Sequence, residues 1–212
     1  VLPGSKNTIA DLTYLYEQGY ADEIKALSAS GVPVLGVCGG NQMLGTVIYD
    51  PEHMEGDVDE MKGLGLLPTA TTMKGTKTTH QVEFDAKELM FLGEPYSGTG
   101  LRGYEIHMGD TVPTGEATRC FNIKTRSEQP VDVIDGFITT DGNVMGTYIH
   151  GILDNDGLRR HIINGLRKRK GLELLPEVFH YFEHKNASYD RLADIVEKHL
   201  DMDYIDRIVG LK

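Results

Sequence analysis

Residues 34–42 read Val-Leu-Gly-Val-Cys-Gly-Gly-Asn-Gln, and this stretch decides the fold class of the chain. The apolar run 33–37 lacks the alternation of a half-buried strand and is typical of a strand buried on both faces of a parallel sheet. Residues 39–48 predict a helix, so Cys38 should lie where a strand meets a helix. Strand, helix and strand in this order predict an α/β fold.

Cys38 lies in a Gly-x-Cys-x-Gly pattern, which is the arrangement of a nucleophile elbow with sulfur in place of a serine oxygen. A sharp, strained turn needs neighbours without a Cβ where backbones pass closely, and Gly36 and Gly40 meet that need. The N-terminus of the following helix favours the thiolate. The backbone N–H of Gly39 should donate to a developing oxyanion. The alternative is an inert cysteine buried in a glycine-rich turn.

A second motif, Gly-Thr-Tyr-Ile-His-Gly, covers residues 146–151 and ends an apolar strand at His150. A histidine at the end of a strand in an α/β sheet faces the crevice where active sites collect. A thiol nucleophile needs a base that takes its proton and returns it to the leaving amine. We therefore predict that His150 is that base. Other histidines fit an ordinary surface or core role: His53, His80, His161, His180, His184 and His199.

Apolar spacing predicts helices over residues 9–29, after His150 with Leu158, Ile162, Ile163 and Leu166 on one face, and from Pro176 to the end. In that last segment Ser188 is expected to cap a helix. Strands are expected over residues 76–84, 103–108 and 119–125. Residues 133–140 and 143–149 flank Asp141-Gly142, which is a strong hairpin signal.

Composition sets limits on the class of protein. A length of 212 residues allows one sizeable core and at most two small domains. The net charge of −11 argues against nucleic acid as a partner. No apolar run approaches the roughly 20 residues of a membrane span, and no signal peptide is visible. Two cysteines do not form a disulfide framework, which favours a reducing compartment such as the cytoplasm.

No metal is expected in this chain. The acidic stretch 50–60 lacks the glycine and ligand spacing of a calcium loop, so we interpret it as a solvated loop in preference to a metal site.

Four blocks together resemble the C-terminal class I glutamine amidotransferase domain of the cobyric acid synthase family. They are Leu-Pro-Gly-Ser-Lys at 2–6, Val-Cys-Gly-Gly-Asn-Gln-Met-Leu-Gly at 37–45, Gly-Tyr-Glu-Ile-His-Met-Gly at 103–109 and the His150 motif. The resemblance extends from Leu2 to about Arg160. It implies a flavodoxin-like α/β fold, with a mostly parallel sheet flanked by helices and an antiparallel hairpin leading to His150. It also implies that Cys38 forms a γ-glutamyl thioester and frees ammonia, with His150 as base and later as acid.

The resemblance further implies a covalently linked N-terminal synthetase domain that uses ATP and Mg²⁺. That domain would amidate four carboxylates of a corrinoid, adenosylcobyrinic acid a,c-diamide, with the ammonia in cobalamin biosynthesis. Residues 1–212 are expected to form the amidotransferase domain alone, without cofactor. Because Val1-Leu2 reads as the end of a strand, we expect the synthetase domain and one or more opening strands to be absent. No Gly-x-x-x-x-Gly-Lys-Ser/Thr phosphate loop occurs in the sequence.

Several site roles can be assigned from the positions of residues in the expected fold. The loop with Gly4 and Ser5 would supply the second oxyanion donor, although Pro-Gly turns are common. Gln42 would hold the glutamine substrate or else face solvent as an ordinary helix residue. Glu105 and His107 would line the same crevice or serve a structural turn.

Many class I relatives carry a Glu two residues after the histidine, where this chain has Ile152. The partner that orients His150 therefore stays open between a backbone carbonyl, a water and Glu105. Without a strong orienting group, glutamine hydrolysis is expected to be slow until the synthetase partner closes.

Three alternatives remain open. The first is a sibling amidotransferase acting on cobyrinic acid a,c-diamide or on cell-wall peptides. The second is a cysteine hydrolase of the same fold. The third is a catalytically silent scaffold domain.

Overall fold

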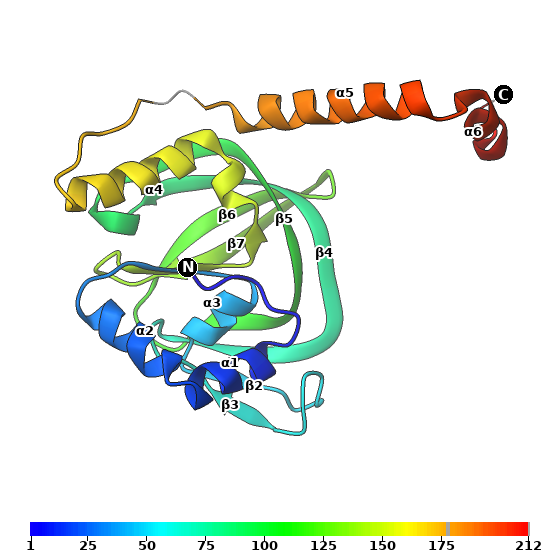
Figure 1. Ribbon diagram of the computed structural model, residues 1–212. Helices are drawn as coiled ribbons and strands as arrows, with labels where there is room; N and C mark the ends of the chain where they lie inside the picture. The colour runs from blue at the N-terminus through cyan, green and yellow to red at the C-terminus, as the bar shows by residue number, and fades with distance from the viewer. Residues whose placement is uncertain (177–178, 212) are drawn as a thin grey trace. The chain divides into compact units, whose positions relative to one another are not determined.

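A computed structural model describes residues 1–176 and 179–211 of the chain (Figure 1). The chain divides into two compact units, Val1–Leu175 and Pro176–Lys212. The first unit holds the sheet, and the second holds the helices α5 (Tyr181–His199) and α6 (Met202–Val209). Within the described residues, no helix combines the length and apolar character needed to cross a membrane.

The sheet has nine strands in the described part of the chain. Its main path runs in the order β1 (Val34–Val37), β8 (Val144–Thr147), β7 (Gln129–Ile138), β6 (Thr118–Arg126), β4 (Thr69–Leu89), β2 (Val47–Tyr49) and β3 (Glu60–Lys62). Off this path, β5 (Tyr96–Pro113) pairs with β4 and with the short β9 (Ile149–His150). The α/β class is confirmed.

The pairing within the sheet corrects the expectation of a mostly parallel arrangement. Among the described strands, only β1 with β8 and β2 with β4 pair in parallel along named strands. The long strands β4 to β7 follow one another through short connections, which antiparallel pairs allow and parallel pairs do not. The expected hairpin is confirmed, since β7 and β8 pair antiparallel on either side of Asp141-Gly142.

Strand β1 is buried on both faces, as its unalternating sequence predicts. Val34 belongs to a core cluster with α1 (Thr8–Glu17), α2 (Tyr20–Ala29) and α3 (Gly39–Leu44). Leu35, the next residue, belongs to a second cluster with α4 (Asp156–Arg169). Successive side chains of a strand point to opposite faces, so helices cover β1 on both sides. This places the end of β1, and with it Cys38, inside the protein.

Three expected helix boundaries differ in the structure. The helix predicted over 9–29 is divided into α1 and α2 by Gly19, whose φ of 78° is left-handed. The helix predicted to reach residue 48 ends at Leu44, and residues 47–49 form β2 between β3 and β4. Ser188 is not a cap, because α5 begins at Tyr181 and the Ser188 hydroxyl donates to the carbonyl of His184 inside that helix.

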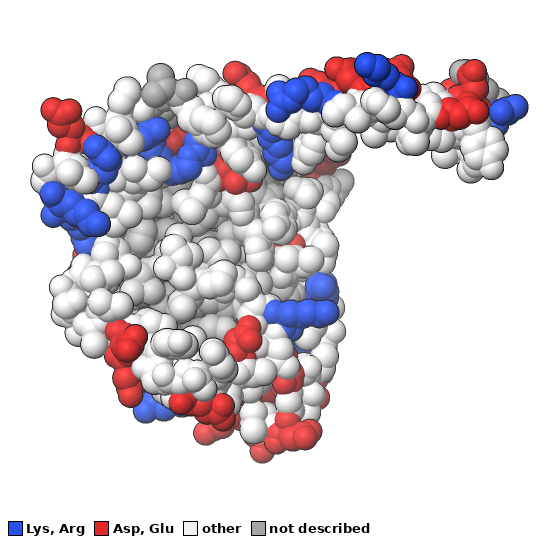
Figure 2. Space-filling view, viewed as in Figure 1, with Lys and Arg blue, Asp and Glu red and all other residues white. Residues whose placement is uncertain are grey.

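Charged side chains of the first unit are unevenly distributed on the face that Figure 2 shows. Lys and Arg gather over α4, whose last turn carries Arg167, Lys168 and Arg169. Cations at this end stabilise the negative end of the helix dipole. Asp and Glu gather near α1 and α2 instead.

Candidate active site

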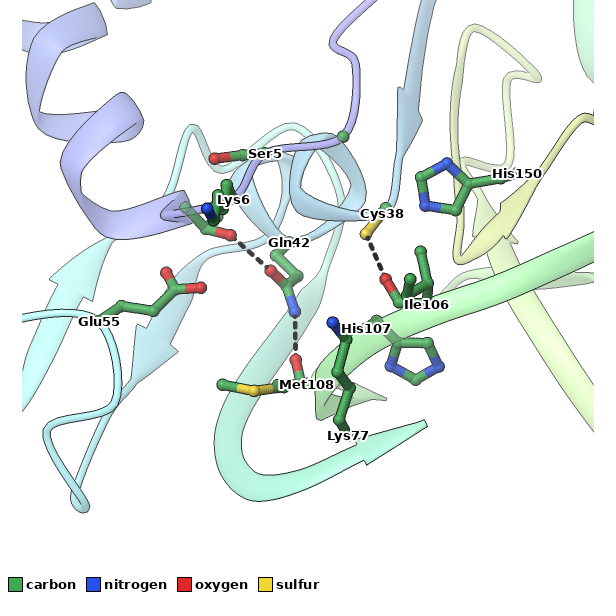
Figure 3. Close-up of a pocket in the computed structure, with 12 residues that line it drawn as sticks. Ser5, Lys6, Cys38, Gln42, Glu55, Lys77, Ile106, His107, Met108 and His150 are labelled. Carbon is green, nitrogen blue, oxygen red and sulfur yellow. Dashed lines mark hydrogen bonds between the residues drawn. The ribbon is translucent and has the colours of Figure 1, made fainter. Parts of the chain in front are cut away.

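A cavity of about 530 Å³ brings most of the predicted site residues together (Figure 3). Its lining includes Gly4, Ser5, Cys38, Gln42, His107 and His150. Gly39 lies directly behind Cys38 at the start of α3. Glu105 is the one predicted residue that the structure places elsewhere.

Cys38 occupies a strained turn between β1 and α3. Its φ of 55° and ψ of −114° lie in a region that residues with a side chain rarely adopt. The turn leaves no room for side chains beside it, because a Cβ on Gly36 would lie 2.6 Å from the Gly40 carbonyl oxygen. A Cβ on Gly40 would lie 2.1 Å from the carbonyl oxygen of Leu2. The predicted need for these two glycines is confirmed.

Gly4 lies beside the side chains of both Cys38 and His150, which are the predicted nucleophile and base. A Cβ placed on Gly4 would lie 3.6 Å from Cys38 Cβ, 3.8 Å from His150 Nε2 and 3.0 Å from His150 Cε1. We call this space the Gly4 gap. The elbow is also tied to the strand before His150, since the Cys38 N–H donates to the Thr147 carbonyl at 2.8 Å. The two motifs, more than a hundred residues apart in sequence, thus meet at one point of the cavity.

The Cys38 thiol is neutral in its resting environment. Burial raises its pKa above the ordinary value, and the charges of Glu55 and Asp135 add to that effect. The Gly39 N–H and the Lys77 ammonium act in the opposite direction, but burial outweighs them. The sulfur lies 3.4 Å from the Ile106 carbonyl oxygen, to which the thiol donates. The Gly39 N–H at the start of α3 therefore lowers the pKa of Cys38, as the sequence predicts, but burial has the larger effect.

His150 is held by a ring contact. Its imidazole stacks on Tyr104 with centroids 4.8 Å apart and planes 8° from parallel. Burial lowers the pKa of His150, and His107 lowers it further, so the ring is neutral near pH 7. Its buried Nε2 has no hydrogen-bond partner among the described residues. A neutral ring with an unpartnered nitrogen at the Gly4 gap can accept a proton there.

Glu105 is engaged on the other side of β5. Its carboxylate accepts two hydrogen bonds from Arg126, from Nε at 2.8 Å and from Nη2 at 3.0 Å. Burial alone would raise the pKa of Glu105, but His107 and Arg126 hold it below the ordinary value. Tyr104, its neighbour, points to His150, and successive residues of a strand face opposite ways. Glu105 is therefore not the group that orients His150.

His107 lines the main cavity and also a second one of about 270 Å³, which Glu105 and Asp135 line as well. Its ring stacks on Tyr148 with centroids 3.8 Å apart. Its Nε2 lies 3.7 Å from Glu105 Oε1, which is beyond hydrogen-bond distance. His107 thus forms part of the wall between the two cavities.

Gln42 does not face solvent, because it is 3% exposed. Its amide nitrogen donates to the Met108 carbonyl at 2.8 Å and to the Tyr148 hydroxyl at 3.2 Å. Its amide oxygen accepts from Thr8 Oγ1 at 2.9 Å. Both amide hydrogens are therefore used by the protein, and the free acceptor lone pair is what Gln42 has left for a ligand.

The loop of Gly4 and Ser5 lies against the start of α3. A Cβ on Gly39 would lie 2.9 Å from the backbone nitrogen of Ser5, so these two backbone segments are in direct contact. The Ser5 hydroxyl donates to Asp11 at 2.5 Å and accepts from the Asn7 N–H at 3.0 Å. The side chain therefore shapes the loop, and the backbone nitrogen of Ser5 lies close to Gly39, the residue after Cys38.

Sequence reasoning missed three charged residues near the thiol. Asp135 on β7 is 6% exposed and accepts hydrogen bonds from the Thr147 hydroxyl and from the Tyr148 N–H. Burial raises the pKa of Asp135 to about 6. Glu55 and Lys77 line the main cavity. None lies in a motif, and only the fold brings them to the elbow.

The acidic stretch 50–60 is more ordered than a solvated loop. Asp50 is fully buried and accepts hydrogen bonds from the backbone N–H groups of Met54 and Glu55, both at 2.8 Å. The expectation of a solvated loop is wrong for Asp50, because these bonds replace its contacts with water. Within the described residues, no group of three or more His, Cys, Asp or Glu side chains could hold a metal ion.

Comparison with known proteins gives the family. Residues 1–158 match the family described as the CobB/CobQ-like glutamine amidotransferase domain. A cobyric acid synthase of Caldanaerobacter subterraneus subsp. tengcongensis is 44% identical over 210 residues, which is 99% of this chain and 41% of that protein. One from Syntrophobacter fumaroxidans is 46% identical over 214 residues, with 100% and 41% covered. The chain spans about 41% of the length of these relatives.

Solved structures overlap more weakly. A glutamine amidotransferase shares 17% identity at a TM-score of 0.47, over 77% of this chain and 76% of that one. PurLQS from Thermotoga maritima shares 19% identity at a TM-score of 0.47, over 69% and 68%. A similarity at this level carries no argument about function. The family match confirms the resemblance found in the sequence: the chain belongs to the CobB/CobQ-like glutamine amidotransferase domain family.

Proposed function

We propose that this chain is the glutamine-hydrolysing domain of a cobyric acid synthase. One observation carries the proposal: Cys38 on its strained turn and the unpartnered Nε2 of His150 border the same Gly4 gap at the wall of a cavity. A thiol and a neutral imidazole in this relation form a nucleophile and its base.

Hydrolysis begins with the side-chain amide of glutamine in the cavity, beside Cys38 and His150. His150 takes the thiol proton from Cys38, and the sulfur attacks the amide carbon. Electrons of the carbonyl bond move to its oxygen, and the N–H groups of Gly39 and Ser5 donate to that oxyanion. These donors are backbone groups fixed by close packing, so they need no reorganisation during the reaction.

The tetrahedral intermediate then collapses. His150, now charged, gives its proton to the amide nitrogen, and the carbon–nitrogen bond breaks to release ammonia. A γ-glutamyl thioester remains on Cys38. A water molecule gives a proton to His150 and attacks the thioester. As the second intermediate collapses, His150 returns that proton to the leaving sulfur and glutamate is released.

The remaining steps belong to the longer protein. Ammonia would pass to a covalently linked synthetase domain, which uses ATP and Mg²⁺ to amidate adenosylcobyrinic acid a,c-diamide in the cytoplasm. The name shared by the curated relatives supports this acceptor over that of a sibling amidotransferase. Because this chain spans about 41% of those relatives, the synthetase activity is proposed for the whole protein and not for this domain.

Slow hydrolysis by the resting domain is part of the proposal. At rest the Cys38 thiol donates to the Ile106 carbonyl, and burial disfavours the thiolate. Activation then requires the thiol to turn towards His150. Glutamine turnover measured with and without the synthetase domain tests this, and equal rates in both would contradict it.

The test of the function is ammonia release from glutamine. Wild type should release ammonia, Cys38→Ala should release none, and His150→Ala should lose at least a hundredfold, the typical contribution of a general base. Cys120→Ala removes the only other cysteine and should leave the rate unchanged. Absence of ammonia from the wild-type domain together with its synthetase partner would exclude the proposal in favour of a hydrolase or a silent scaffold.

A further inference from the structure

We propose that Glu55 and Lys77 form a subsite for the head group of the amino-acid substrate. Glu55 binds the α-ammonium group, and Lys77 binds the α-carboxylate. The inference rests on the proposed function and deepens it, since it names the residues that distinguish free glutamine from other primary amides.

The cavity is lined by more charged side chains than the binding of an uncharged amide requires. Apart from its histidines, the cavity is lined by one carboxylate, Glu55, and by two ammonium groups, Lys6 and Lys77. A primary amide is uncharged and is served by the backbone donors at Cys38. A free amino acid, by contrast, carries one positive and one negative group on the carbon at the far end of its side chain. A carboxylate and an ammonium group in one cavity match that pair.

Glu55 is positioned by its loop. The buried Asp50 accepts the N–H of Glu55, and the side chain of Asn7 donates to the Glu55 carbonyl at 2.9 Å. One carboxylate oxygen, Oε2, accepts the N–H of Ile9 at 3.1 Å near the start of α1. These bonds, with further hydrogen bonding from Thr8, hold the carboxylate at the wall of the cavity, where a ligand can reach it.

Glu55 lacks a cation in the resting structure. No Lys or Arg side chain pairs with it within the described residues. Burial raises the pKa of Glu55, so an ammonium group that arrives in the cavity would stabilise the charged carboxylate. The half-buried position also makes the interaction stronger than at an open surface.

Lys77 reaches the cavity from an irregular part of β4. The register of β4 against β5 shifts between Thr72 and Lys77, so the strand bulges at this point. A Cβ on Gly75 in this bulge would lie 3.2 Å from Glu52 Oε2, so the bulge lies against the loop that carries Glu55. The two charged residues therefore come from neighbouring segments.

Figure 3 shows Glu55 and Lys77 approaching from either side of Gln42. Both lie within electrostatic reach of the sulfur, since the charge of Glu55 raises the pKa of Cys38 and that of Lys77 lowers it. Lys77 forms no ion pair within the described part of the chain. Of the two lysines, only the charge of Lys77 acts on the pKa of Cys38, so we assign Lys77 the α-carboxylate of a substrate bound at Cys38.

The experiment pairs each variant with the substrate analogue that lacks its group. Glutaramate is glutamine without the α-amino group, and 4-aminobutanamide is glutamine without the α-carboxylate. Wild type, Glu55→Gln and Lys77→Met are assayed with all three amides by ammonia release, in the 212-residue chain together with its synthetase partner. A hydrogen bond between charged groups corresponds to about a tenfold to hundredfold change in kcat/KM.

We expect a crossed pattern, in which each variant loses activity towards glutamine but not towards the analogue that lacks the group its residue binds. Glu55→Gln should lower kcat/KM for glutamine by about tenfold to a hundredfold, chiefly through KM, and should leave glutaramate nearly unaffected. Lys77→Met should do the same for glutamine and spare 4-aminobutanamide. Two control variants at exposed positions, Asp57→Asn in the same loop and Lys87→Met in the same strand, should leave kcat/KM unchanged for all three amides. If either residue had only a structural role, its substitution would lower kcat/KM for all three amides together.

The outcomes separate the two proposals. Ammonia release by wild type with equal losses for all amides, or with none, would overturn the subsite while leaving the glutaminase function intact. If Lys6→Met and not Lys77→Met shows the crossed pattern, the assignment to Lys77 is overturned. No ammonia release by wild type from any amide would refute the proposed function itself.

Discussion

Replacing Asp135 by Asn should stabilise the protein progressively as the pH rises. The carboxyl of Asp135 is buried below the elbow, where burial raises its pKa from 3.8 to about 6. The folded state therefore holds the proton more tightly than the unfolded chain does. As the pH rises from 4 to 6 the unfolded carboxyl ionises first, so the stability present below pH 4 is lost through this window.

The magnitude follows from the separation of the two pKa values. It corresponds to roughly 2–3 kcal/mol between pH 4 and pH 8. Asn has the shape of the protonated acid and can still accept the Tyr148 N–H, which Asp135 accepts at 3.1 Å. The Thr147 hydroxyl, which now donates to Asp135, can turn to accept from the new amide. Asp135→Asn should therefore lack the pH-dependent loss.

Urea denaturation of both proteins at a series of pH values measures this directly. The difference in the free energy of unfolding, variant minus wild type, should rise by roughly 2–3 kcal/mol between pH 4 and pH 8. Asp132→Asn on the same strand is the control, because that side chain is 84% exposed and should give a nearly flat difference. Parallel curves for wild type and Asp135→Asn, or a difference that falls with pH, would refute the reasoning.

Other predictions concern the elbow and the buried ion pair. Gly40→Ala should lower the free energy of unfolding by about 2–4 kcal/mol, since the new methyl would lie 2.1 Å from a backbone carbonyl oxygen. Gly56→Ala, with no atom within 4 Å, should change it by less than about 0.5 kcal/mol, and urea denaturation compares the two. Alkylation of Cys38 should still accelerate as the pH passes the ordinary thiol pKa of 9.0, because burial raises its pKa and the thiolate is the reactive form; a plateau below pH 8 would argue otherwise. Arg126→Met should destabilise the fold by about 3–5 kcal/mol by leaving the buried Glu105 unpaired, and adding Glu105→Gln should recover most of that loss in thermal unfolding. A double variant no more stable than the single one would count against this account.

The elbow could be predicted from the sequence because its constraints are local. Cys38 needs a neighbour without a Cβ on either side, and Gly36 and Gly40 are visible at fixed spacing. The burial of β1 on both faces is visible in the same way, as an apolar run without alternation. Such features depend on residues that are adjacent in the chain, so pattern and sterics are enough to find them.

Other parts of the fold depend on contacts that are distant in sequence. Residues 47–49 continue a helical pattern, yet they form β2 because β3 and β4 pair with them on either side. The mostly antiparallel pairing also follows from which strands meet, although the short connections between them were a signal for it. Single-residue errors such as Ser188 arise because α5 starts a full two turns earlier than its cap-like residue suggests.

The site shows the same division. Cys38 and His150 stand in motifs, whereas Asp135 and Glu55 are ordinary acidic residues in the sequence. Asp135 acquires its environment from Thr147 at the end of β8 and from Tyr148, and Glu55 from the N-terminal part of α1. Glu105 stands in a motif but is engaged by Arg126, because strand alternation turns it away from Tyr104 and His150. Motif membership alone therefore does not identify which side chains reach the cavity.

Covalent labelling by a diazoketone analogue of glutamine tests the central claim most directly. Peptide mapping by mass spectrometry should find one adduct, on Cys38, with glutamine protecting the wild-type protein and His150→Ala reacting much more slowly. Cys120, buried in the core, should stay unmodified and serves as the internal control. An adduct on Cys120, or no adduct on Cys38 in the protein that contains the synthetase domain, would contradict the account.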